Sequence, residues 1–120
     1  MQSDSPALLD AVTVLSGGFG RYWQFTTSRV NRGAPDPEAI YVRLADVKGL
    51  RSVLEDKVRW FIPHGTSHIQ PDEVTSMVRA LTQLGRMPDE GARQRVWLAL
   101  AQWLDDRATS TVLVRMQVFR

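Results

Sequence analysis

The 120-residue chain contains no cysteine, and this absence excludes several kinds of site at once. Disulfide bonds, thiolate metal sites and cysteine nucleophiles all require the missing thiol. No run of about 18 apolar residues occurs either, so the sequence predicts no membrane-spanning helix. The opening Met-Gln-Ser-Asp-Ser-Pro places no basic stretch ahead of an apolar one, so we expect no signal peptide and a cytoplasmic location.

Motifs for phosphate loops and metal sites are also missing. The glycine-rich segment 17–20 lacks the preceding strand and following helix that a dinucleotide-binding motif requires. His64 and His68 lie four residues apart, but the glycine and proline around them indicate a loop, and no third ligand stands nearby. We therefore expect no catalytic residue, no metal, no cofactor and no enzymatic activity.

Lysine is scarce, with two lysines against thirteen arginines and a formal net charge of +2. The planar fork of arginine suits phosphate and carboxylate recognition, although a GC-rich genome would produce the same bias. The hydrophobic fraction of 43% and the charged fraction of 23% are those of an ordinary globular protein. We therefore expect one domain that covers residues 1–120.

Prolines stand where helices would begin. Proline is tolerated at the first helical position, because its missing N–H needs no partner there. Acidic residues follow three of these prolines and complement the helix dipole. Helices are predicted over residues 5–16, 37–48, 50–62, 71–84 and 88–106, with the second and third either separated at Gly49 or continuous.

The last of these segments carries the densest apolar cluster of the chain. Residues 92, 96, 99, 100 and 103 share one helical face, and Trp97, Leu98 and Leu104 widen that face. A helix with so little polar surface needs neighbours on several sides. The sequence therefore predicts a mainly α protein, a small bundle of four to five helices around residues 88–106.

The C-terminal segment 109–119 changes to the alternation of a β-strand. Its apolar positions are Val112, Val114, Met116 and Val118. A single strand cannot satisfy its own backbone hydrogen bonds. Two pairing partners therefore remain possible for this strand. One is residues 22–27, whose aromatic and β-branched side chains favour an extended conformation, and the other is another chain by strand addition.

The segment 17–32 interleaves arginines with aromatic residues, the combination that holds single-stranded nucleic acid. A second basic group is expected on the outer side of residues 43–59. The alternative is that the rings pack in the core and the arginines are simply solvated. The predicted nucleic-acid contacts are Arg21, Tyr22, Trp23, Arg29, Arg32, Arg43 and Arg51.

These features favour a non-enzymatic helical binding module, a small subunit of a nucleic-acid-handling assembly of the defence or phage-related kind. Its expected partners are other protein subunits and RNA or single-stranded DNA, and no membrane. One alternative is a protein–protein adaptor or inhibitor that uses the C-terminal strand. Another is a helix-turn-helix DNA-binding protein over residues 74–104, but the acidic Asp89 and Glu90 would repel phosphate at the start of its second helix.

Overall fold

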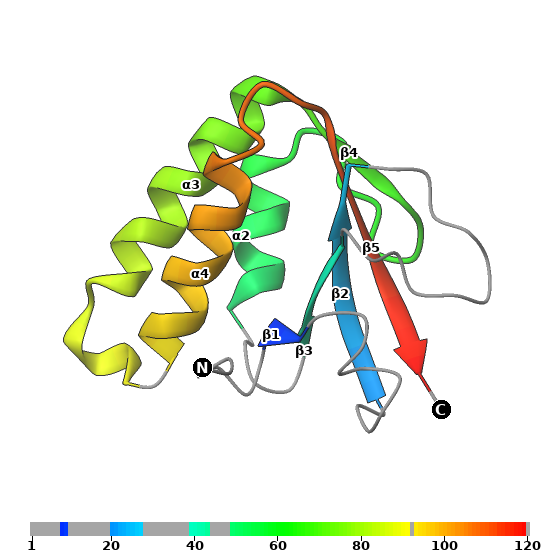
Figure 1. Cartoon of the computed structure of the whole chain (residues 1–120). Helices are drawn as coiled ribbons and strands as arrows, with labels where there is room; N and C mark the ends of the chain where they lie inside the picture. Colours follow the sequence, from blue (N-terminus) through cyan, green and yellow to red (C-terminus); the bar gives the residue numbers. More distant parts are fainter. Residues whose placement is uncertain (1–7, 10–19, 28–38, 44–48, 92, 120) are drawn as a thin grey trace.

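The computed structural model describes residues 8–9, 20–27, 39–43, 49–91 and 93–119. Three α-helices lie on one side of an antiparallel β-sheet, so the described chain forms two layers (Figure 1). The helices are α2 (Leu50–Lys57), α3 (Pro71–Gly85) and α4 (Arg93–Asp105), with a 3-10 turn, η2, at Pro88–Glu90. The strands are β1 (Leu8–Leu9), β2 (Gly20–Thr26), β3 (Ile40–Arg43), β4 (Ser67–Ile69) and β5 (Val112–Phe119).

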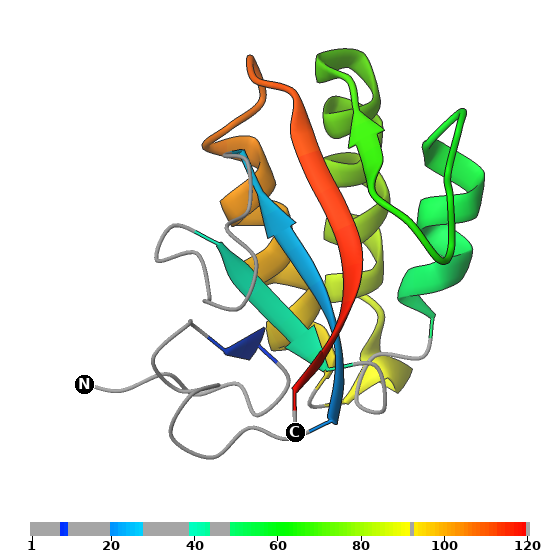
Figure 2. The same ribbon diagram turned by 90° about the vertical axis from the view of Figure 1, so that its right-hand side faces the viewer.

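The sheet has the strand order β1-β3-β2-β5-β4, and every neighbouring pair is antiparallel. β2 lies between β3 and β5, so Trp23 is opposite both Val42 and Met116. β5 pairs with β2 from residue 113 to residue 119, whereas β4 pairs only with residues 112–114 of β5. In Figure 2, β4 accordingly lies beside the upper part of β5 only.

Strand alternation separates the two faces of the sheet. Trp23 and Phe25 of β2 and Val42 of β3 belong to the main hydrophobic core with the helices. Because side chains alternate along a strand, Tyr22 and Gln24 point to the opposite face. These two side chains are 0% and 1% exposed, so the centre of the sheet is buried on both faces.

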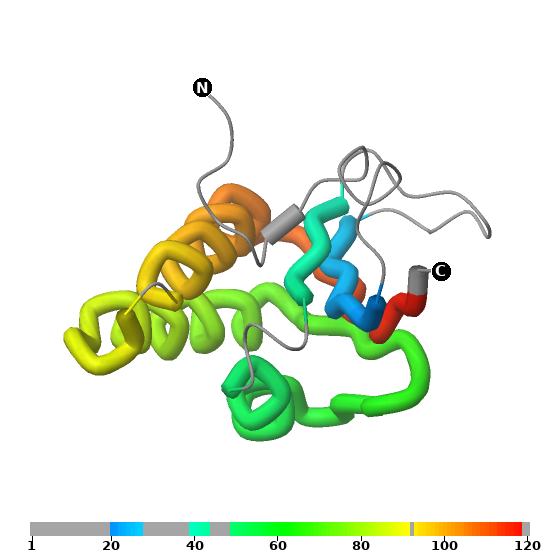
Figure 3. The backbone as a smooth tube through the Cα atoms, turned by 90° about the horizontal axis from the view of Figure 1, so that it is seen from below, coloured from blue at the N-terminus to red at the C-terminus, as the bar shows by residue number. Residues whose placement is uncertain are grey.

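Within the helical layer, α3 and α4 lie side by side, as the view in Figure 3 shows. α4 buries Trp97, Leu100 and Leu104, as expected for the most apolar segment of the chain. The indole Nε1 of Trp97 donates a hydrogen bond of 2.6 Å to Glu90 Oε2, which ties η2 to α4. Trp103 is half-buried, and its ring packs against Phe25 of the sheet.

The predicted helical bundle is wrong, because an antiparallel sheet replaces part of it. Ile40–Arg43, expected within a helix, forms β3, and Leu8–Leu9, expected in the first helix, forms β1. The helix-start signal at Pro37 and the helical spacing of Ile40, Tyr41 and Leu44 were misleading. The β-branched and aromatic residues of β3 favour a strand, and their backbone groups form hydrogen bonds with β2. The remainder of both predicted helices lies outside the described residues.

Other elements follow the sequence closely. α3 covers the predicted segment, and α2 forms the first part of residues 50–62. α4 begins only at Arg93, because Pro88–Glu90 forms a 3-10 turn and Gly91 follows at φ +60°. The C-terminal strand pairs with β2, the internal partner that the sequence left open. β4 was not expected, since residues 64–70 were predicted to be a loop.

Candidate functional site

The outer edge of β5 is not paired with any described strand over most of its length. β4 covers only residues 112–114, and no other strand among the described residues pairs with that edge of residues 115–119. Five residues of extended chain span about 17 Å at about 3.4 Å per residue. An unpaired edge presents a row of backbone N–H and C=O groups that can pair with another strand.

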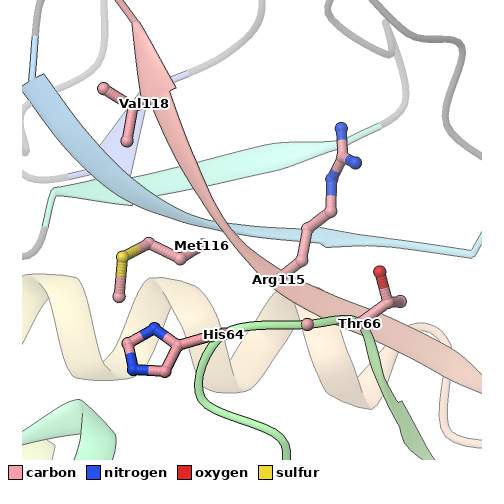
Figure 4. Close-up of a pocket in the computed structure, with 6 residues that line it drawn as sticks. His64, Thr66, Arg115, Met116 and Val118 are labelled. Atoms are coloured by element: carbon pink, nitrogen blue, oxygen red, sulfur yellow. The ribbon is translucent and has the colours of Figure 1, made fainter.

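A pocket of about 270 Å³ lies along this open edge, between β5 and the turn that precedes β4 (Figure 4). It is lined by His64, Gly65, Thr66, Arg115, Met116 and Val118, which together we call the edge groove. Sites for small molecules usually enclose about 300–1,000 Å³ and bury most of the ligand. The edge groove is smaller and opens to solvent, so its shape suits an extended main chain better than a small substrate.

The side chains that line the edge groove differ between the two sides of β5. In Figure 4, Arg115 and Thr66 point to one side of β5, whereas Met116 and His64 lie on the other. Val118 shares the face of Met116 by strand alternation, and its side chain is 46% exposed. A strand placed in the groove would therefore meet different chemistry on its two faces.

Hydrogen bonds fix the turn that forms the outer wall of the groove. The Ile62 N–H donates to Ser67 Oγ at 2.7 Å, and the Gly65 N–H donates to the Ile62 carbonyl at 3.3 Å. A Cβ atom at Gly65 would approach Ile62 Cγ2 to 2.9 Å, so the turn leaves no room for a side chain there. The wall of the groove is thus held in place independently of any ligand.

Two residues that shortly precede the groove wall in the sequence expose apolar surface. The side chain of Trp60 is 79% exposed and that of Ile62 is 51% exposed. Phe61, between them, packs inward on Trp23 with 5.7 Å between ring centroids. Large exposed apolar side chains of this kind are typical of surfaces that bind other proteins.

A chain of buried hydrogen bonds orients Arg115. Its Nε donates to Gln24 Oε1 at 2.8 Å, and Gln24 Nε2 donates to the Tyr41 hydroxyl at 2.8 Å. Gln24 and Tyr41 are fully buried, so the side-chain amide of Gln24, which is hydrogen-bonded to both Arg115 and Tyr41, cannot rotate freely. Within the described part of the chain, the two terminal nitrogens of Arg115 have no partner and remain available for an acceptor.

Positive charge is concentrated in the sheet. Strands β2 to β5 contain Arg21, Arg43, Arg115 and His68 and no acidic residue. The other described residues contain eight Lys or Arg and eight Asp or Glu, so their formal charges cancel. The electrostatic character of the sheet therefore favours an anionic partner.

The structure describes five of the seven predicted nucleic-acid contacts and does not gather those five into one surface. Tyr22 and Trp23 are buried on opposite faces of the sheet, so neither ring is available for base stacking. Arg21 is exposed, and Arg51 lies on α2, where its Nε is 3.2 Å from Glu55 Oε2.

Arg43, also predicted as a contact, is half-buried, and its Nη2 donates to the Tyr22 hydroxyl at 3.0 Å. Its guanidinium carbon lies 5.5 Å from the centroid of the same ring. The remaining two predicted contacts, Arg29 and Arg32, lie outside the described residues. Of the predicted arginines that the structure describes, Arg21 and Arg51 are thus exposed and Arg43 is half-buried.

The edge groove was not predicted from the sequence. It exists because β4 is only three residues long and begins at Ser67, and a three-residue strand carries no periodicity that a sequence pattern could detect. From the sequence, His64 was weighed as a metal ligand and as the catalytic histidine of a hydrolase, and neither role was predicted. In the described ranges, no group of three or more His, Asp or Glu side chains is placed to hold a metal ion.

The helix-turn-helix alternative gains little from the structure. α4 buries Val96, Trp97 and Leu100, so much of the expected recognition helix faces the core. Arg93, at the start of that helix, donates to the Glu90 carbonyl at 3.3 Å and lies beside the Glu90 carboxylate.

None of the helices in the described chain is long and apolar enough to cross a bilayer.

Comparison with protein-family models, with curated proteins and with solved structures finds no match to the chain. The geometry of the edge groove and the charge of the sheet are therefore the features that bear on its function.

Proposed function

We propose that the protein is a non-enzymatic binding module that receives an extended segment of a partner protein along the open edge of β5. The observation behind this proposal is the difference in length between β4, with three residues, and β5, with eight. In strand addition, main-chain hydrogen bonds supply affinity and side-chain pockets supply specificity. Within the described chain, the edge groove offers both unpaired main-chain groups and a pocket for side chains. The role corresponds to the adaptor or inhibitor among the sequence hypotheses.

The composition of the open edge supports this proposal. Proteins usually protect a free edge with lysine, proline, a bulge or a covering element. Residues 115–119 read Arg-Met-Gln-Val-Phe and contain neither lysine nor proline. The exposed Trp60 and Ile62, which precede the groove wall in the sequence, add apolar surface of the kind found at binding hot spots. An edge of this composition is expected to be covered in the functional assembly.

The proposal is tested by selecting peptides from a random display library on the immobilised full chain. Binding of the enriched peptides is then measured on two variants. Val118→Lys places a charge on the apolar side of the groove, and Met87→Lys makes the same kind of change at a site that is 42% exposed outside it. We expect Val118→Lys to weaken binding by about tenfold or more, because an edge lysine opposes strand pairing. Met87→Lys should have no effect.

Hydrogen exchange locates the bound segment. Strand addition should slow amide exchange within residues 115–119 and leave the exchange of α3 unchanged. The proposal is refuted by a library that yields no binder. It is also refuted by binders that ignore Val118→Lys and leave exchange in residues 115–119 unaltered.

A second candidate function is nucleic-acid binding, and the concentration of positive charge in the sheet favours it. In this case the chain would belong to a nucleic-acid-handling assembly and contact phosphates through Arg21 and Arg43 rather than through stacked rings. Anisotropy of a labelled single strand of about 16 nucleotides at about 50 mM salt tests it. Binding should weaken with added salt and in the Arg21→Ala and Arg43→Ala variants. Absence of binding at low salt excludes this candidate.

A further inference from the structure

We infer that the segment accepted by the edge groove alternates apolar with acidic residues, and that one of its carboxylates pairs with Arg115. This inference rests on the proposed strand addition and specifies the chemistry of the partner. It follows from the two sides of the groove, from the fixed position of Arg115 and from the absence of acidic residues in β2 to β5.

The two sides of the groove predict a two-residue period in the ligand. Side chains of an added strand point alternately to its two faces, and opposing side chains on paired strands lie about 4.5–5.5 Å apart. One set would meet Met116 and Val118, which are apolar and only partly buried. The other set would meet Arg115 and Thr66, which point to the opposite side (Figure 4). Apolar residues suit the first side and hydrogen-bond acceptors the second.

The side chain of Arg115 is already oriented in a way that suits binding of a carboxylate. Gln24 occupies its Nε, so the two terminal nitrogens present the end of the guanidinium fork, which can donate two parallel hydrogen bonds. The buried Gln24 and Tyr41 already hold the side chain, so little further freedom is lost when an anion binds. An acidic residue should therefore be preferred over an amide of the same shape.

A second copy of this chain does not supply that carboxylate through its own β5. The strand contains no acidic residue, and self-pairing would bring two arginine-bearing strands together. The chemistry of the groove instead favours a different protein with an acidic, amphipathic extended segment. Self-association remains a measurable outcome of the experiment.

The test uses synthetic peptides of about nine residues that alternate valine with glutamate, glutamine or lysine. Each peptide is added to the full chain, and binding is measured by anisotropy. Each is also appended after Arg120 through an Asn-Gly turn, so that it can fold back on β5 at an effective concentration in the mM range. The tethered form makes weak pairing visible as a rise in Tm.

We expect the glutamate peptide to bind about tenfold more tightly than the glutamine peptide, and the lysine peptide to bind least. Arg115→Gln should reduce the glutamate preference to about twofold or less, and Arg115→Lys should restore part of it. Arg79→Gln, which removes the same charge from the exposed face of α3, should leave the preference intact. Gln24→Leu should lower the preference without removing the charge, which identifies Gln24 as a positioning residue.

The outcomes separate this inference from the proposed function. Equal binding of all three peptides, with residues 115–119 protected from exchange, overturns the acidic preference and leaves strand addition standing. Failure of every peptide, free or tethered, to bind or to raise Tm overturns both. A dimer that Val118→Lys dissociates would identify a second copy as the occupant and would also overturn the inference.

Discussion

Replacement of Glu73 by alanine should destabilise the protein far more than replacement of its neighbour Asp72. Glu73 is 5% exposed although it carries a carboxylate. Its Oε2 accepts the backbone N–H of Arg59 at 2.7 Å, and its Oε1 accepts the backbone N–H of Gln70 at 2.8 Å. The same carboxylate lies 3.3 Å from Arg59 Nε. It thus joins the start of α3 to the chain that leads to the edge groove.

The expected cost follows from these contacts. A fully buried N–H that loses its acceptor costs about 1–3 kcal/mol. The two hydrogen bonds to Glu73 are part-buried, so water can partly replace the lost acceptor, and together they give about 2–4 kcal/mol in the free energy of unfolding. The ion pair with the Arg59 side chain adds little, because that side chain is 55% exposed. Glu73→Gln should fall between Glu73→Ala and the native protein, since an amide oxygen still accepts one hydrogen bond.

Urea denaturation followed by tryptophan fluorescence measures the effect. Asp72→Ala is the matched control, because Asp72 also lies near Arg59, with Oδ2 3.1 Å from Arg59 Nη1, but its side chain is 65% exposed. That variant should lie within about 0.5 kcal/mol of the native protein. If Glu73→Ala costs no more than Asp72→Ala, the carboxylate does not hold the two backbone segments together as described.

Three further changes test the packing and the groove. Trp97→Phe should cost about 2–3 kcal/mol in thermal unfolding, since it removes the hydrogen bond to Glu90 and leaves a cavity; an effect no larger than that of Trp103→Phe would contradict this. Gly85→Ala should cost about 1–3 kcal/mol, because the new Cβ would lie 2.5 Å from Leu98 Cγ, and Leu98→Ala in the same chain should recover part of the loss. Trp60→Ala should change stability by less than about 0.5 kcal/mol, since the ring is 79% exposed, yet weaken the peptides selected on the native chain. Unchanged peptide affinity would place Trp60 outside the binding surface.

The elements that the sequence predicted well are those set by local signals. In α3, a proline at the first position, two acidic residues in the first turn and an apolar face all agree. The alternation in residues 112–119 likewise identified β5. Pairing between β2 and β5 joins residues such as Gln24 and Arg115, 91 positions apart. The sequence could suggest that partner but could not choose it over another chain.

The candidate site depended on features with no local signature. Tyr22 and Trp23 are adjacent in sequence and point to opposite faces of β2, and a stretch rich in aromatic residues does not show that both faces are covered. Arg115 becomes part of a groove only because β4 begins no earlier than Ser67. The start of this short edge strand is set by the turn at residues 62–65, which the hydrogen bonds from Ile62 to Ser67 and from Gly65 to Ile62 hold.

The position of β5 in the sheet also affects how the protein folds during synthesis. β2 is among the first strands made, yet one of its two neighbours is the last strand of the described chain. Until residue 119 leaves the ribosome, Trp23 and Phe25 stay without the neighbours that cover them from β5. Such long-range pairing slows folding and exposes nascent chains to aggregation, so chaperone contact is expected to concentrate on residues 20–26.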